Sequence, residues 1–142
     1  MVYLITGKKN SGKTTYAKRL VKELEEEGNK VLWLDGDELR NETGNNDFTP
    51  KGRYGNLMLA ASRAQKAERE GKIVVLSFVA PLKAWRNSMR CYFKHSHTVY
   101  IPGGELWEGS TYEVPDIKEL CMSIRGRKLV IDGLWAEVIT HE

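Results

Sequence analysis

The sequence predicts an α/β fold in which a five-stranded parallel β-sheet carries helices on both faces, within one domain that spans residues 1–142. Two observations support this prediction. Short apolar runs rich in β-branched residues alternate with segments whose apolar residues recur at helical spacing. Parallel neighbours also need crossover connections, which the helical segments supply. Such sheets bind ligands at the carboxyl ends of their strands, so functional residues are expected directly after each strand.

The expected elements follow one another in strict alternation. The strands are 2–5, 31–34, 73–79, 98–101 and 129–131, and the third is the most apolar, as expected for a central strand buried on both faces. Gly28 and Gly71 end the first two helices, and Pro81 lies where the third can begin. Residues 38–50 are polar and are expected to form a loop. The apolar helix faces are Ala17, Leu20, Val21 and Leu24; Leu57, Ala60, Ala61 and Ala64; Leu82, Trp85 and Met89; and Ile117, Leu120, Cys121 and Ile124.

Composition narrows the class of protein. With 142 residues, 41% of them hydrophobic and 29% charged, the chain has the makeup of one soluble domain. No apolar run approaches the roughly 18 residues of a membrane helix, and a cytoplasmic protein without a membrane partner is expected. The formal charge of +3 favours an anionic ligand but does not by itself indicate nucleic-acid binding. Cys91 and Cys121 are expected to be buried free thiols on helix faces.

Residues 7–14, Gly-Lys-Lys-Asn-Ser-Gly-Lys-Thr, match the pattern G-x-x-x-x-G-K-[ST] between an apolar strand and an amphipathic helix. Glycines let backbone N–H groups turn toward phosphates, and the helix N-terminus adds its positive dipole end. Lys13 supplies a charge for the β- and γ-phosphates of ATP, and the Thr14 hydroxyl supplies a ligand for Mg²⁺. The pattern predicts a P-loop NTPase fold. The expected ATP-binding residues are Gly7, Lys8, Lys9, Asn10, Ser11, Gly12, Lys13, Thr14 and Thr15, among which Lys8, Lys9 and Thr15 fit solvated or helix-start positions better than catalytic ones.

Two carboxylates follow the second strand in Asp35-Gly36-Asp37, which the topology places beside the phosphate loop. A kinase needs a carboxylate near the acceptor hydroxyl to orient it and accept its proton. Asp37 is therefore the candidate base, with Lys13 as the second catalytic residue. Asp35 joins Thr14 as a candidate Mg²⁺ ligand, or only orients the loop. A solvated acidic turn is the alternative interpretation of this motif.

With these motifs the chain resembles the adenylylsulfate kinases, which use ATP to phosphorylate the 3′-hydroxyl of adenosine 5′-phosphosulfate. The resemblance covers roughly residues 1–102. Beyond the phosphate loop it rests on Asp-Gly-Asp-Glu-Leu-Arg at 35–40, on Phe-Thr-Pro-Lys-Gly-Arg-Tyr-Gly-Asn at 48–56, and on Ser-Phe-Val-Ala-Pro at 77–81 followed by Arg86 and Arg90. It implies a phosphotransferase with ATP, Mg²⁺ and a small-molecule nucleotide acceptor.

The resemblance also implies roles for single residues. Asp37 matches the catalytic acid/base of the family, and Phe48 matches an aromatic residue that stacks on the substrate adenine. Arginine clamps anionic oxygens in a bidentate way, and an aromatic face gives a purine a flat apolar partner. A homodimer is compatible with the resemblance. The complete expected substrate-binding set is Arg40, Phe48, Arg53, Asn56, Phe78 and Trp107.

The sequence departs from the family pattern at several places. Gly52 stands where the family usually has Asp, and Ala80 where it often has Ser. The segment at 102–114 is shorter than the lid of the family, and Trp107, at a Phe position, either stacks on a substrate base or caps the core. A shorter lid leaves room for a larger acceptor, so a kinase of nucleosides, nucleotides or modified nucleic acid is the alternative function. A nucleotide-binding module without transfer activity is a third interpretation.

Overall fold

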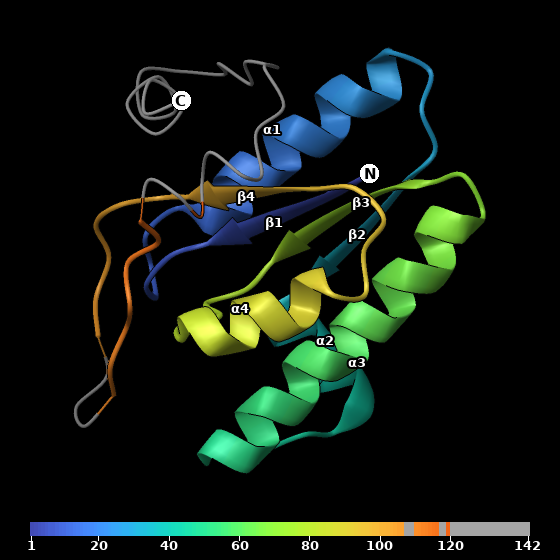
Figure 1. The fold of residues 1–142 in the computed structure, drawn as a ribbon. Helices are drawn as coiled ribbons and strands as arrows, with labels where there is room; N and C mark the ends of the chain where they lie inside the picture. The colour runs from blue at the N-terminus through green and yellow to red at the C-terminus, as the bar shows by residue number, and fades with distance from the viewer. Residues whose placement is uncertain (107–109, 117–118, 120–142) are drawn as a thin grey trace.

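A computed structural model describes residues 1–106, 110–116 and 119, in which a parallel sheet carries helices on both faces (Figure 1). The spatial order of the strands is β2-β3-β1-β4, all parallel. The prediction of a parallel α/β sheet is confirmed for four strands, and the predicted strand 129–131 lies outside the described residues. The strands are β1 (Val2–Thr6), β2 (Val31–Asp35), β3 (Ile73–Ser77) and β4 (Ser96–Tyr100), and the helices are α1 (Lys13–Glu26), α2 (Gly36–Thr43), α3 (Pro50–Arg69) and α4 (Lys83–Arg90).

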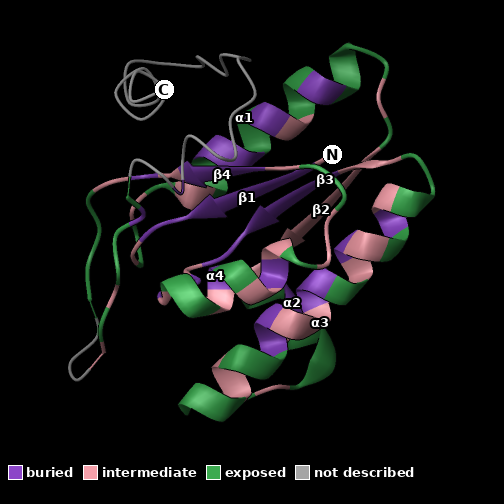
Figure 2. Cartoon of the chain, viewed as in Figure 1, coloured by how far each residue is buried: buried purple, intermediate pink, exposed green. Residues whose placement is uncertain are grey.

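The sheet has a hydrophobic core on each face. Helix α1 covers one face, and α2, α3 and α4 lie over the other (Figure 1). Successive side chains of a strand point to opposite faces, so Tyr3 and Ile5 pack with α1 while Val2 and Leu4 pack with α3. Strand β1 is consequently buried along its whole length, whereas β2 at the sheet edge is only half-buried (Figure 2).

Helix α3 approaches the sheet through small side chains. Ala60, Ala61, Ala64 and Ala67 are all at most 3% exposed, and they let the helix backbone lie close to the strands. Thr49 is the N-cap residue and its hydroxyl accepts a hydrogen bond from the Gly52 amide, which satisfies one of the orphan donors of the first turn. The helix therefore starts well before the apolar face that the sequence shows.

Two expectations from the sequence are wrong. The expected loop at 38–50 begins with helix α2, because Leu39 is buried against the core and Asp37 and Glu38 in the first turn favour the positive end of the helix dipole. Cys91 is an exposed free thiol, because α4 ends at Arg90 and the cysteine is its C-cap. The other expected apolar-face cysteine, Cys121, lies outside the described residues, as does most of the predicted helix around it.

In the part of the chain that the structure describes, no helix combines the length and the apolar character needed to cross a bilayer.

The alanine face of α3 gives a test of the packing. We expect Ala64→Leu to lower the free energy of unfolding by about 2 kcal/mol, because the larger side chain has no space between helix and sheet. Urea unfolding followed by circular dichroism measures this change. Ser62→Leu introduces the same side chain at an exposed position of the same helix and should change stability by less than about 0.5 kcal/mol. Equal losses in the two variants would show that α3 is not packed through this face.

Candidate functional site

The loop between β1 and α1 takes its shape from two glycines. A Cβ atom at Gly7 would lie 2.6 Å from the Ile101 carbonyl oxygen and 2.7 Å from the Ser11 hydroxyl, so no side chain fits there. Gly12 has φ 102°, a left-handed conformation that glycine adopts without steric cost, and it is the N-cap of α1. The helix N-terminus thus follows a loop of backbone N–H groups, which is the arrangement that binds phosphate.

Lys13 bridges this loop. Its Nζ donates a hydrogen bond of 2.7 Å to the Lys8 carbonyl oxygen. Burial lowers the pKa of Lys13, while the carboxylates of Asp35 and Asp37 act in the opposite direction. The ammonium group is therefore held between the loop and two carboxylates that follow β2. Phosphate oxygens entering the loop would provide further anionic partners for this partly buried ammonium group.

The Asp35 carboxylate connects the ends of β2 and β3 with the start of α1. Its Oδ1 accepts hydrogen bonds from the Thr14 hydroxyl at 3.2 Å and from the Ser77 hydroxyl at 2.8 Å. Ser77 in turn accepts a bond of 2.9 Å from the Trp33 indole N–H. Parallel register makes this possible, because Asp35 at the end of β2 pairs with Ser77 at the end of β3. A hydroxyl and a carboxylate facing each other beside a phosphate loop fit Mg²⁺, which takes few protein oxygens together with substrate phosphates.

Across from the loop, Arg40 is fixed by the chain that follows α2. Its Nη1 donates to the carbonyl oxygens of Asp47 at 3.1 Å and of Asn45 at 3.3 Å, and its guanidinium lies 4.4 Å from the centre of the Phe48 ring. Burial and then the nearby Arg53 guanidinium lower the pKa of Arg40. Two cations that lie close enough to repel each other make this side of the site suited to an anion.

Asn56 is a polar residue of α3 that is buried in the core. Its side chain is 5% exposed, and its Oδ1 is buried without a hydrogen-bond partner. A buried carbonyl oxygen in this state costs about 1–3 kcal/mol, unless a ligand supplies the donor.

The Phe78 ring is also buried, and it packs closely against Gly36. A Cβ atom added to Gly36 would lie only 3.2 Å from the Cδ2 atom of this ring.

These groups surround one hollow with a volume of about 460 Å³. It brings together most of the residues that the sequence predicts: Lys9, Asn10, Gly12, Lys13, Thr14, Thr15, Asp35, Asp37, Arg40, Phe48, Arg53, Asn56 and Phe78. Gly7, Lys8 and Ser11 shape the loop without lining the hollow. Trp107 lies outside the described residues. Val79, Ala80 and Pro81 form one wall of the hollow. The sequence indicates them only as part of the motif at 77–81 and not as binding residues, because their apolar side chains carry no chemical signal.

The turn before α3 explains the glycine at position 52. A Cβ atom on Gly52 would lie 2.3 Å from the Asp47 carbonyl oxygen and 2.4 Å from the Asp47 Cγ, so the aspartate fills the place of a side chain there. Hydrogen bonds from the Thr49 hydroxyl and amide hold this carboxylate and lower the pKa of Asp47. Asp47 is not among the site residues expected from the sequence, although the Asp-Phe-Thr-Pro spacing is a helix-start signal that points to it.

Comparison with known proteins agrees with this geometry. Residues 1–104 match the family described as adenylylsulphate kinase. A probable adenylyl-sulfate kinase of Archaeoglobus fulgidus is 38% identical over 90 residues, covering 63% of this chain and 58% of that protein. One from Aeropyrum pernix is 42% identical over 91 residues, covering 63% of this chain and 50% of that protein. The chain thus spans little more than half the length of these relatives. The APS kinase of Mycobacterium tuberculosis in complex with AMPPNP and APS has a TM-score of 0.67 at 25% identity, covering 71% of this chain and 61% of that one.

The position of Asp47 gives a test of the turn. Gly52→Ala should lower the free energy of unfolding by about 1–3 kcal/mol, because the new Cβ overlaps backbone that cannot move freely. Gly55→Ala is the matched control in the same helix: nothing lies within 4 Å of its Cβ position, so alanine should stabilise by up to about 1 kcal/mol. Urea unfolding measures both. A stabilising Gly52→Ala would contradict the described contact.

Proposed function

The chain belongs to the adenylylsulphate kinase family, and we propose on this premise that it transfers the γ-phosphoryl group of ATP to the 3′-hydroxyl of adenosine 5′-phosphosulfate. One observation carries the proposal. A single hollow has a phosphate loop on one side and, on the other, a carboxylate, two arginines and a buried amide. These are the groups needed to hold two nucleotides with their phosphates facing each other.

The phosphate loop forms the donor side. Its backbone N–H groups and the Lys13 ammonium bind the β- and γ-phosphates, and Lys13 exchanges its contact with the Lys8 carbonyl for phosphate oxygens. Thr14 and Asp35 are the residues that would hold Mg²⁺, which offsets charge on the transferring group when it is bound. The Ser77 hydroxyl keeps the Asp35 carboxylate oriented toward this position.

Side chains of α2, α3 and the turn between them form the acceptor side. Arg40 and Arg53 offer their guanidinium groups to the anionic phosphosulfate. The Phe48 ring has Arg40 on one side and is 54% exposed, so it presents a flat surface to the adenine. Asn56 Oδ1 can accept a hydrogen bond from an amino or hydroxyl group of the nucleotide, which satisfies its buried oxygen.

Asp37 is proposed as the base. It lies in the first turn of α2, lines the hollow, and is close enough to Lys13 to influence its pKa. A carboxylate there can orient the acceptor hydroxyl and take its proton while the phosphoryl group moves across. Asp37 is exposed to solvent, so an approaching nucleotide can reach its carboxylate and supply a hydrogen-bond partner.

Product analysis decides between acceptors. The protein is incubated with ATP and Mg²⁺ and a pool of hydroxyl acceptors that includes adenosine 5′-phosphosulfate, nucleosides and short oligonucleotides, and the products are identified by mass spectrometry. A phosphorylated adenosine 5′-phosphosulfate is expected. Phosphorylation of a nucleoside or oligonucleotide instead would replace the proposed acceptor, and ATP binding without any product would indicate a nucleotide-binding module.

The role of Asp37 predicts a selective loss. Asp37→Asn should reduce phosphoryl transfer by at least about a hundredfold, because the proton acceptor is removed, while ATP affinity stays within a few-fold. Steady-state kinetics and nucleotide titration measure the two quantities. Glu38→Gln is the control, since it makes the same charge change at the next, exposed residue and does not line the hollow. Unchanged turnover in Asp37→Asn would remove Asp37 from the mechanism.

The buried oxygen of Asn56 predicts opposite effects on stability and binding. Asn56→Leu replaces the unpaired buried carbonyl by apolar atoms on a side chain of the same branching, so the free protein should be at least as resistant to urea as the natural one. The KM for the acceptor should rise about tenfold or more, because a hydrogen bond to the nucleotide is lost, while the KM for ATP stays within about twofold. A variant that loses stability but keeps its acceptor KM would contradict the assignment.

A further inference from the structure

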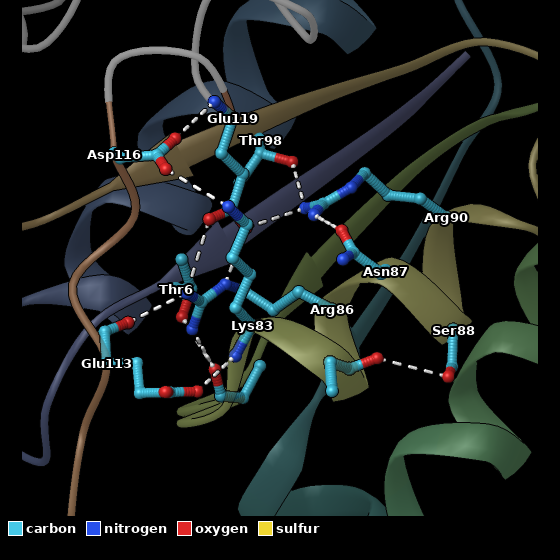
Figure 3. Close-up of polar contacts among 12 residues, drawn as sticks. Thr6, Lys83, Arg86, Asn87, Ser88, Arg90, Thr98, Glu113, Asp116 and Glu119 are labelled. Atoms are coloured by element: carbon cyan, nitrogen blue, oxygen red, sulfur yellow. Dashed lines mark hydrogen bonds and ion pairs between the residues drawn. The ribbon is translucent and has the colours of Figure 1, made fainter.

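A fully buried arginine lies behind the hollow. Arg86 on α4 has a side chain that is 0% exposed, and it does not line the hollow. Its Nε donates to Glu119 Oε1 at 2.7 Å, its Nη1 to the Ala80 carbonyl oxygen at 2.7 Å, and its Nη2 to the Glu113 carbonyl oxygen at 2.7 Å. Figure 3 shows Arg86 pointing from α4 toward Glu119 and Glu113. A buried guanidinium with this many partners fixes the groups it contacts.

One of those groups is a strained part of the wall. Ala80 has φ 43°, a left-handed conformation that costs a residue with a Cβ about 1 kcal/mol or more and persists only when its surroundings enforce it. Ala80 and its neighbours Val79 and Pro81 line the hollow on the side of Phe78. The wall is thus in a conformation that the local sequence does not favour.

Every carbonyl oxygen of this wall is held from behind. The Val79 oxygen accepts from the Thr6 hydroxyl at 2.6 Å, the Ala80 oxygen from Arg86, and the Pro81 oxygen from the Glu113 amide at 2.7 Å. Thr6 is the last residue of β1, directly before the phosphate loop, and its hydroxyl also contacts the Tyr112 hydroxyl at 2.7 Å. The wall therefore depends on groups from β1, from α4 and from Tyr112, Glu113 and Glu119.

We propose that Arg86, anchored by Glu119, is a positioning residue for the acceptor: it holds Val79–Pro81 in the shape against which the acceptor nucleotide fits. The residue acts through the Ala80 carbonyl and touches no substrate. Lysine cannot replace it, because one ammonium group cannot reach Ala80, Glu113 and Glu119 from the fixed planar geometry that the guanidinium provides. This inference rests on the proposed function for the identity of the acceptor.

Arg90 supplies a matched control within the same cluster. It lies one helical turn further along α4, and its Nη1 contacts Glu119 Oε1 at 3.0 Å (Figure 3). Its other bonds go to the Thr98 hydroxyl and the Asn87 side chain, so the described contacts of Arg90 include none with the wall. Substituting either arginine disturbs the same buried carboxylate, but of the two arginines Arg86 alone contacts the Ala80 carbonyl oxygen, which also accepts a longer bond of 3.4 Å from the Thr6 hydroxyl.

The kinetic test compares Arg86→Lys with Arg90→Lys in the full chain. Arg86→Lys should raise the KM for adenosine 5′-phosphosulfate about tenfold or more, while the KM for ATP stays within about threefold. The Ala80 carbonyl then loses its hydrogen bond from the charged guanidinium, so the wall formed by Val79–Pro81 is no longer held in shape. Arg90→Lys should leave both KM values within about threefold. It should lower the midpoint of urea unfolding by about as much as Arg86→Lys does. Equal effects on the acceptor KM would show that Arg86 has only a structural role.

A second variant tests the strain. Glycine adopts the conformation of Ala80 without a Cβ penalty, so in an Ala80→Gly background the wall needs less support. There, Arg86→Lys should raise the acceptor KM by less than about threefold. An undiminished effect would overturn the proposal that the arginine enforces this conformation.

A measurement without substrate keeps this inference separate from the proposed function. Hydrogen exchange of the backbone amides in residues 78–82 should be at least about tenfold faster in Arg86→Lys than in Arg90→Lys, in the absence of any nucleotide. If the natural protein does not phosphorylate adenosine 5′-phosphosulfate, the proposed function fails while the exchange result still decides whether Arg86 holds the wall. Equal exchange in both variants would contradict the inference.

Discussion

The structure of the site depends on the Asp35 carboxylate. This group accepts hydrogen bonds from Thr14 at the start of α1 and from Ser77 at the end of β3, while it is itself the last residue of β2. The parallel register aligns Asp35 and Ile5 with Ser77, so the three strands end at one level. The phosphate loop, the Asp35-Gly36-Asp37 motif and the wall after β3 must then lie along one edge of the sheet, where parallel α/β sheets bind ligands.

The two sides of the hollow are built in different ways. The donor side is made of backbone, and its shape depends on glycine conformations and on one lysine. The acceptor side is made of side chains from α2, α3 and the turn held by Asp47, with a wall supported from behind by Arg86. The proposed phosphate binding thus depends on the loop that follows β1, whereas the proposed acceptor recognition depends on side chains of α2, α3 and the turn between them.

Much of this arrangement could be predicted from sequence, for physical reasons. Strands buried on both faces are continuous apolar runs, and the glycines and Lys13 occur at fixed spacing, so both signals are local. Helix α2 was missed because a short polar helix with one buried residue, Leu39, has no apolar periodicity. The need for glycine at position 52 comes from its contact with Asp47. In the sequence Arg86 looks like a solvent-exposed basic residue, and only the structure shows its contact with Glu119, 33 residues later in the chain. Such contacts arise only from tertiary structure.

We propose that one hollow holds both nucleotides with Asp37 between them. A crystal structure of the protein with a non-hydrolysable ATP analogue, Mg²⁺ and adenosine 5′-phosphosulfate tests it most directly. We expect the acceptor between Arg40 and Arg53, with its 3′-hydroxyl at hydrogen-bond distance, about 2.6–3.2 Å, from an Asp37 carboxylate oxygen. An acceptor bound outside the hollow, or one whose hydroxyl faces another group, would contradict it.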